Sequence, residues 1–311
     1  MIPPKLIQRI SNLPFLLLTL TPLFWSGNIV LARGINEIIP PIGLAFWRWT
    51  LALIFLLPFT WKHAKQDWKV ALGSWKILTV ISIFGISCFN TMLYKAAHTT
   101  TAINIALMQS TMPAVIILFS LLLFKEKISK IQMIGVSICM LGAFSIILHG
   151  NWKTLMELSF VEGDIWMAVA VVFYALYSTL LHKRPEIHGL SVLTFTFAIG
   201  ISLLLPFYLW ELSYSDPIEL SWQVVSSILY VAVFPSIVSY LFWNRSIQLV
   251  GANRAGLFIN LIPVFASILA VLLLGESLYV YHFAGMILIG CGMFLFNYQT
   301  VFANGQTPMV K

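Results

Sequence analysis

Charged residues are scarce in this sequence. Asp, Glu, Lys and Arg make up 9% of its 311 residues, whereas hydrophobic residues make up 59%. Soluble globular chains carry about 25% charged residues. Neither a disordered chain nor a soluble enzyme of this size fits so much apolar side chain. The composition therefore indicates a protein that lies within a lipid bilayer.

Cysteines and catalytic motifs are equally sparse. The three cysteines, Cys88, Cys139 and Cys291, lie in apolar runs without a CxxC pair, which argues against a disulfide framework or a zinc site. There is no HExxH, GxSxG, phosphate-binding loop or GxGxxG, and no basic stripe with interleaved aromatics. We therefore expect no metal, no cofactor and no nucleic-acid partner. An embedded enzyme and a non-transporting scaffold or sensor are the minor alternatives.

Long apolar runs are what the sequence does contain. Runs of about 20 residues match helices that cross a hydrocarbon core about 30 Å thick. We predict an all-α polytopic membrane protein with ten transmembrane helices as two inverted five-helix repeats. The predicted spans are Leu13–Ala32, Pro41–Trp61, Lys76–Ala97, Thr101–Phe124, Ile131–His149, Gly163–His182, Leu190–Trp210, Val224–Leu249, Ala252–Leu274 and Leu278–Tyr298. The first run has no convincing small-residue cleavage site, so we interpret it as a helix rather than a signal peptide.

The distribution of basic residues predicts the orientation. With the N-terminus in the cytoplasm, only Arg33, Lys95 and Lys153 fall on the outer side, and Arg48 lies within a helix. The remaining Lys and Arg fall on the inner side, as the positive-inside rule requires. We therefore expect an inner-membrane protein with both termini in the cytoplasm. The same rule accounts for the net charge of +7.

An internal repeat appears when the chain is shifted by 150 residues. The shift places Pro113 on Pro263, Glu126 on Glu276, Gly135 on Gly285 and Gly142 on Gly292. Each half holds five spans, an odd number, so the second half must enter the membrane from the opposite side. Inverted repeats of this kind are typical of secondary transporters. The predicted domains are 1–150 and 151–311, and we expect the four glycines to mark close helix packing.

Two prolines interrupt repeat-related helices near their middles. Pro113 and Pro263 remove a backbone hydrogen bond and kink the fourth and ninth helices. The polar side chains of Gln109 and Ser110 precede the first proline, and Asn260 precedes the second. Interrupted helices of this kind mark substrate sites and gates in transporters. The alternative is that these prolines only shape the bundle, with the polar groups satisfying the backbone.

Polar residues also follow single faces of four other helices. These residues are Thr21, Trp25 and Asn28; Ser87, Asn90, Thr91 and Tyr94; Tyr174, Tyr177 and Ser178; and Ser236, Ser239, Tyr240, Trp243 and Asn244. Contact with lipid would be costly for them, so they should face the interior, as cavity lining or as contacts between helices. We predict a central cavity for a small polar solute with some apolar surface. The predicted substrate contacts are Trp25, Asn28, Asn90, Tyr94, Gln109, Ser110, Tyr174, Tyr177, Tyr240, Trp243, Asn244 and Asn260.

Ionisable residues are nearly absent from the predicted membrane interior. No Asp or Glu lies in mid-helix, which favours passive, gradient-driven transport over proton coupling. Arg48 lies about two turns, roughly 11 Å, from the outer helix end. We interpret it as a structural residue that reaches outward to the interface or bonds to helix-end carbonyls, with a functional role as the alternative. Lys95, Arg245 and Arg254 are interpreted as interfacial anchors, or else as contacts for an anionic substrate.

The two segments PAVIILFSLLLFKEKISKIQMIGVSICMLGAF and PVFASILAVLLLGESLYVYHFAGMILIGCGMF each carry Pro, then Glu, then two Gly. With Trp25-Ser26 and Arg48, they resemble the drug/metabolite transporter superfamily, specifically proteins with two tandem EamA domains. Lys125 departs from the pattern, since a small residue often precedes that Glu. The resemblance implies a ten-helix bundle whose two halves enclose a central cavity and give alternating access.

Members of this family commonly export amino acids or related metabolites, and others carry nucleotide-sugars, sugar phosphates or S-adenosylmethionine. The relatives that carry phosphates place basic residues in the cavity. Because the cavity faces in this sequence look neutral and aromatic, we expect an amino-acid or metabolite exporter. The alternative is a transporter of anionic or adenosyl metabolites. The expected partners are a small-molecule substrate and membrane lipid.

Overall fold

The computed structural model describes residues 12–35, 38–157, 161–215, 221–274 and 277–302, and these ranges contain helices, turns and loops without a strand. Nine helical stretches within them are long and apolar enough to cross a membrane. A further 22-residue helix, α2, runs through the bundle beside them. The chain is therefore an all-α polytopic membrane protein, as its composition predicts.

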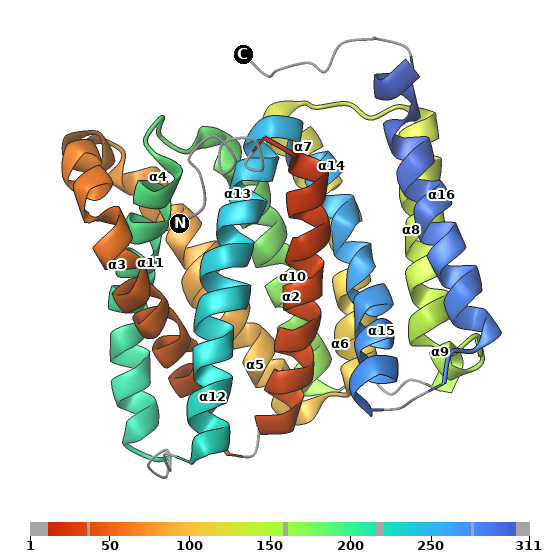
Figure 1. Ribbon diagram of the computed structural model, residues 1–311, viewed down its shortest axis with the longest axis horizontal. Coiled ribbons are helices and arrows are strands. Elements are labelled where there is room, and N and C mark those ends of the chain that lie inside the picture. The colour runs from red at the N-terminus through yellow and green to blue at the C-terminus, as the bar shows by residue number, and fades with distance from the viewer. Residues whose placement is uncertain (1–11, 36–37, 158–160, 216–220, 275–276, 303–311) are drawn as a thin grey trace.

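The helices follow the predicted spans, several of them as broken rods (Figure 1). They are α2 (Pro14–Ile35), α3 (Pro41–Gly73), α4–η1–α5 (Trp75–Ser82, Ile83–Cys88, Phe89–Thr99), α6 and α7 (Ala102–Ser110, Met112–Phe124), α8 (Lys130–Ile147), α10 (Glu162–Leu180), α11 (Gly189–Leu212), α12–η3–α13 (Trp222–Val231, Ala232–Val238, Ser239–Val250), α14–η4–α15 (Ala252–Leu257, Phe258–Leu261, Ile262–Leu274) and α16 (Val280–Phe302). The short elements α9 (Thr154–Glu157) and η2 (Leu181–Lys183) lie between them.

Helix α3 extends beyond the predicted second span. Helix α3 does not end near Trp61 but continues to Gly73, over 33 residues. A helix of this length is about 50 Å long, whereas the hydrocarbon core is about 30 Å thick. Six of the twelve residues from Lys62 to Gly73 are Lys, His, Gln or Asp, so mean hydropathy falls there, but no Gly or Pro stops the helix before Gly73. The loss of hydropathy marks the edge of the membrane rather than the end of the helix.

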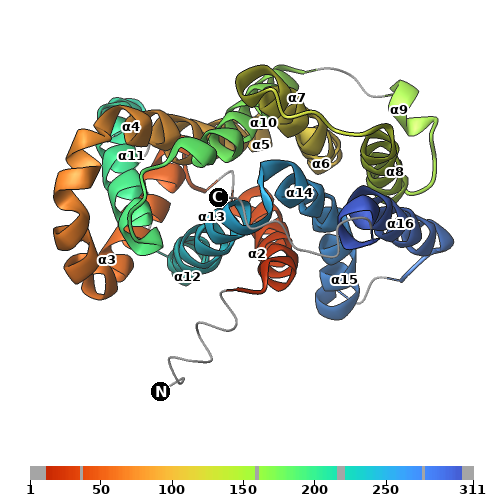
Figure 2. The same ribbon diagram turned by 90° about the horizontal axis from the view of Figure 1, so that it is seen from above.

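The long helices form an elongated bundle (Figure 2). Helices α3 and α11 pack together at one end of it, and α8 and α16 pack together at the other. Between these pairs, α5 packs on α10 and α13 packs on α2. Exchanging the two halves of the chain converts the α5–α10 contact into the α13–α2 contact, as a two-fold relation between inverted repeats requires. Below, the N-terminal face is the one where α2 begins, and the other is the opposite face.

Glycines bring α8 and α16 into backbone contact, which agrees with the predicted close packing. A Cβ atom at Gly142 would stand 2.7 Å from the carbonyl oxygen of Gly285. A Cβ at Gly135 would stand 2.7 Å from the carbonyl oxygen of Gly292. Gly142 thus faces Gly285, the repeat partner of Gly135, and Gly135 faces Gly292, the repeat partner of Gly142. This order of contacts requires the two helices to run antiparallel.

Helices α3 and α11 cap each other's N-termini. The carboxylate of Glu211, near the end of α11, accepts hydrogen bonds from the backbone N–H groups of Ile42 (3.1 Å) and Gly43 (2.6 Å). Asp67, in the extension of α3, accepts from the His188 N–H (3.0 Å) and from the Ser191 hydroxyl (2.6 Å) at the start of α11. A carboxylate at a helix N-terminus satisfies unpaired N–H groups and interacts favourably with the helix dipole. The pair is fastened at both faces of the bundle.

The Glu211 cap gives a stability prediction. Glu211→Ala leaves two backbone N–H groups of α3 without their acceptor in a buried position, which should lower the free energy of unfolding by about 2 kcal/mol. Thermal unfolding of the purified protein in detergent measures the effect. Glu157→Ala, in the exposed helix α9, is the control and should change stability by less than about 0.5 kcal/mol. Equal midpoints for the two variants would contradict a stabilising cap.

The residues around Asp67 lead to a prediction about how stability depends on pH. The rings of His63 and His188 stack 3.9 Å apart. Burial and the neighbouring His63 hold the pKa of His188 below its ordinary value, although Asp67 acts in the opposite direction. Near and below pH 6.5 the unfolded chain therefore binds more protons at this position than the folded chain, so stability falls as pH falls. His188→Asn should reduce the difference in melting temperature between pH 7.5 and pH 5.5, and an unchanged difference would contradict this assignment.

Candidate functional site

Four broken helices meet at the centre of the bundle. The π-helical segments η1 and η3 occupy repeat-related positions, since Ile83 and Cys88 fall on Val233 and Val238 after the 150-residue shift. The fourth crossing breaks between α6 and α7, and the ninth passes through the 3-10 segment η4. π-Helical turns inside α-helices occur frequently at functional sites. Pro235 in η3 was a sequence signal for one of these breaks; η1 contains no proline.

A small chamber lies between these breaks. Its lining residues are Trp25, Asn28, Ile29, Arg48, Phe89, Asn90, Leu93, Gln109, Met112, Tyr174, Tyr240, Ile259 and Ile262. They include six of the predicted substrate contacts. The space for water centres is about 20 Å³, roughly enough for one water molecule. The chamber is therefore closed around very little free space.

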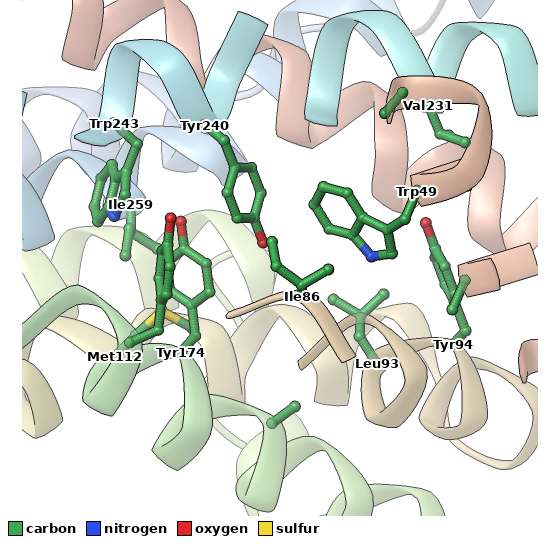
Figure 3. Close-up of a cluster of buried hydrophobic side chains, with 14 of the residues drawn as sticks. Trp49, Ile86, Leu93, Tyr94, Met112, Tyr174, Val231, Tyr240, Trp243 and Ile259 are labelled. Carbon is green, nitrogen blue, oxygen red and sulfur yellow. The ribbon is translucent and has the colours of Figure 1, made fainter. Parts of the chain in front are cut away.

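Trp25, Tyr174 and Tyr240 contribute aromatic rings to the chamber lining, and Trp243 belongs to the same buried cluster as Tyr174 and Tyr240 (Figure 3). Trp25 lies with its ring centroid 5.2 Å from Trp243 and 5.5 Å from Tyr174, the latter in an edge-on arrangement. The indole N–H of Trp25 donates to the carbonyl of Pro235 in η3 (3.2 Å), and that of Trp243 donates to the Ser178 hydroxyl (3.1 Å). The rings thus present apolar faces while their polar atoms hold neighbouring helices.

Two hydrogen-bonded pairs, which we call seals, lie on either side of the chamber, one towards each face. Near the N-terminal face, the Tyr177 hydroxyl donates to the Asn244 side chain (2.6 Å). Near the opposite face, the Tyr94 hydroxyl donates to the Asn28 side chain (3.1 Å). Tyr94 and Asn244 are repeat partners, and the repeat partner of Asn28 is Ser178, beside Tyr177. One member of each seal, Tyr94 or Asn244, is therefore related to the other by the repeat, whereas Tyr177 falls on Gly27 and has no counterpart in the first seal.

At the chamber centre, a repeat-related pair joins the two halves directly. The Asn90 side-chain amide donates to the Tyr240 hydroxyl (3.3 Å), and these residues are 150 positions apart. The Tyr240 hydroxyl in turn donates to the Gly85 carbonyl within η1 (2.6 Å). Tyr240 thus satisfies a carbonyl in the π-helical segment of the other half, so the break in one repeat is supported by the other.

Arg48 lies inside the bundle rather than at its surface. Its side chain is only 1% exposed and lines the chamber. Its Nε donates to the Ser236 hydroxyl (2.5 Å), and its Nη1 donates to Asn90 (2.8 Å), Tyr94 (2.7 Å) and Asn28 (3.3 Å). The expected outward reach to the interface is therefore wrong, and so is the expected neutral cavity. A lipid-facing arginine would reach outward, but this bundle supplies acceptors inside.

Several buried polar atoms around the chamber have no hydrogen-bond partner within the described chain. They are Oε1 of Gln109, the hydroxyl of Tyr174, the indole N–H of Trp49 and both amide atoms of Asn260. Leaving such an atom unpaired costs roughly 1–3 kcal/mol. Asn260 lies in η4 between the lining residues Ile259 and Ile262. Its repeat partner Ser110 differs, since its hydroxyl donates to the Ala106 carbonyl.

The prolines and the other basic residues occupy different surroundings. Pro113 and Pro263 are buried within the first turn after their helix breaks. None of Lys95, Arg245 and Arg254 belongs to the chamber lining. The Lys95 ammonium lies 4.0 Å from the ring centroid of Trp166, beside a mainly apolar groove of about 570 Å³ between α5 and α11. In the ranges described, no cluster of three His, Cys, Asp or Glu side chains could hold a metal ion.

Comparison with known proteins extends these observations. The model of the EamA-like transporter family matches residues 12–148 and again residues 161–298. An uncharacterized transporter of Bacillus subtilis, YyaM, is 29% identical over 87% of this chain and 89% of its own length. An uncharacterized transporter of Archaeoglobus fulgidus is 26% identical over 90% of this chain and 96% of its own. A solved crystal structure covers 92% of this chain and 97% of its own with a TM-score of 0.71, and at 16% identity it shows the fold alone.

Proposed function

The chain belongs to the EamA-like transporter family, and on that premise we propose that it is a secondary transporter that exports amino acids or similar small metabolites by alternating access. Its two halves, 1–150 and 151–311, are proposed as the repeats that exchange roles. The proposed location is the cytoplasmic membrane, with both termini in the cytoplasm, because the basic residues gather on the N-terminal face.

The observation that carries the proposal is the small central chamber with one hydrogen-bonded pair towards each face. Alternating access needs a site that each half can open in turn. Opening the Tyr94–Asn28 pair would expose the chamber to one face, and opening the Tyr177–Asn244 pair would expose it to the other. The breaks before Pro113 and Pro263 lie in helices beside the chamber and would act as hinges.

The chamber's chemistry supports a small zwitterion. In the lining, the unpaired side-chain groups of Gln109 and Tyr174 offer hydrogen bonds, and the rings of Trp25 and Tyr240 offer apolar surface. Asn260, with an unpaired amide, follows the lining residue Ile259 in the chain. A free amino acid with an apolar side chain needs both hydrogen bonds and apolar surface. No acidic residue belongs to the described lining, which is consistent with transport that does not depend on a proton gradient.

A second candidate is a transporter of anionic or adenosyl metabolites. It is favoured by one observation, the positive charge of Arg48 in the chamber. Lys95, Arg245 and Arg254, which a sequence argument would assign to this role, do not line the chamber. Any anion recognition would therefore depend on Arg48 rather than on them.

Counterflow in proteoliposomes tests the proposal. Vesicles loaded with amino acids, with S-adenosylmethionine or with sugar phosphates are compared, with and without a proton gradient. We expect saturable amino-acid exchange that is indifferent to the gradient. Exchange confined to the sugar phosphates or the adenosyl compound would contradict the amino-acid assignment and favour the second candidate.

A further inference from the structure

Arg48 is a buried cation whose recorded acceptors are all neutral. Its hydrogen-bond partners are two side-chain amides and two hydroxyls, from α2, α5 and η3. A guanidinium stays protonated in proteins, and burying a charge without an opposite charge is unfavourable. Trp49, whose ring centroid lies 4.9 Å from the guanidinium carbon, adds only a cation–π contact. Within the described part of the chain, no negative charge balances the guanidinium of Arg48 at this site. A bound ligand could supply that charge.

The donor count shows where that ligand would bind. A guanidinium has five N–H groups in a planar fork. Within the described part of the chain, the hydrogen bonds of Arg48 start from Nε and Nη1, so Nη2 is the nitrogen that a ligand in the chamber would meet first. One oxygen of a carboxylate can accept from Nη2. Its second oxygen reaches the parallel N–H of Nη1 when one of the neutral acceptors on Nη1 is released.

The rest of the chamber is neutral, which sets the total charge that it can accept. Its unpaired acceptors, Oε1 of Gln109 and the hydroxyl of Tyr174, can receive N–H groups from an ammonium without supplying a negative charge. A single fixed positive charge beside neutral acceptors favours one carboxylate over a free amine. It also disfavours a multiply charged phosphate, for which the lining offers no second cation.

We propose that Arg48 is the anchor for a substrate carboxylate, so that the transported molecule must carry one. This inference rests on the proposed transport function and narrows its substrate class. A carboxylate bound at Nη2 draws the guanidinium away from Asn28 and Tyr94, which together form the seal towards the opposite face. The same contact that recognises the substrate thus weakens one seal, which couples binding to opening.

Competition against counterflow of labelled L-phenylalanine tests the anchor without altering the protein. N-acetyl-L-phenylalanine keeps the carboxylate and loses the ammonium, whereas L-phenylalaninamide loses the carboxylate. We expect the N-acetyl compound to compete at least about 10-fold better than the amide, because a desolvated charge pair is lost with the amide. The N-acetyl compound, but not the amide, should also raise the melting temperature of the wild-type protein.

Variants add a second measurement. Arg48→Gln should reduce phenylalanine exchange by about 100-fold and abolish the preference for carboxylates, and Arg48→Lys should retain part of both. Lys153→Gln, on an exposed loop, should behave as wild type. Equal competition by the amide and the N-acetyl compound, with exchange of phenylalanine intact, would overturn the anchor and leave the transport proposal standing. Absence of exchange for phenylalanine and for every other amino acid and metabolite tested in counterflow, with no stabilisation by any of the three compounds, would overturn both.

Discussion

Gly292→Ala should lower the free energy of unfolding by about 3 kcal/mol, the upper part of the range for overpacked sites. The added methyl carbon would stand 2.5 Å from the Gly135 carbonyl oxygen and 2.7 Å from the Cys139 backbone nitrogen. Both are backbone atoms of α8, so no side-chain rotation relieves the clash. The two helices would have to separate along the contact that closes this end of the bundle.

The same helix offers a matched control. At Gly290 an added Cβ would meet no other atom within 4 Å. Gly290→Ala should therefore be neutral or stabilise the protein by up to about 1 kcal/mol, because alanine favours helix more than glycine does. Thermal unfolding in detergent compares the two variants directly. Equal stability of the two would show that α8 and α16 do not pack through Gly292.

The contact between α8 and α16 could be predicted from the sequence because it depends on the spacing of glycines alone. Gly135 and Gly142 recur at Gly285 and Gly292 after a shift of 150 residues. Two small residues seven positions apart share one helix face, and small faces permit close helix packing in membranes. Hydropathy likewise predicted the crossings, because the bilayer imposes one length on every span.

The hydrogen-bond partners of Arg48 could not be predicted from residue spacing or hydropathy. Its distance from the helix end suggested an outward reach, since for an isolated helix the interface is the nearest polar surroundings. In the bundle, acceptors from α2, α5 and η3 lie closer than the interface. These contacts join residues 20 to 188 positions apart, which no local pattern reveals. The π-helical segment η1 could not be predicted for a similar reason. Its Gly85 carbonyl accepts a hydrogen bond from Tyr240, which lies in the other half of the chain.

Asn260→Leu should reduce substrate exchange by more than about 10-fold while leaving the protein at least as stable as wild type. Both amide atoms of Asn260 are buried without a partner within the described chain, and the side chain is fully buried. Each unpaired atom costs roughly 1–3 kcal/mol in the closed state. Leucine has a similar shape and no polar atoms, so it removes that cost together with the hydrogen bonds that a substrate would receive.

Opposite changes in stability and exchange separate a binding role from a structural one. A residue kept for packing would lower stability when replaced, whereas groups kept for function often cost stability. Asn297→Leu is the control, because its amide donates to the Met293 carbonyl of its own helix, away from the chamber; it should leave exchange unchanged. Counterflow and thermal unfolding are measured on the same preparations of each variant. If the Asn260→Leu protein were stabilised but exchanged substrate at the wild-type rate, Asn260 would not be a binding residue, because its unpaired amide would make no hydrogen bond to the substrate.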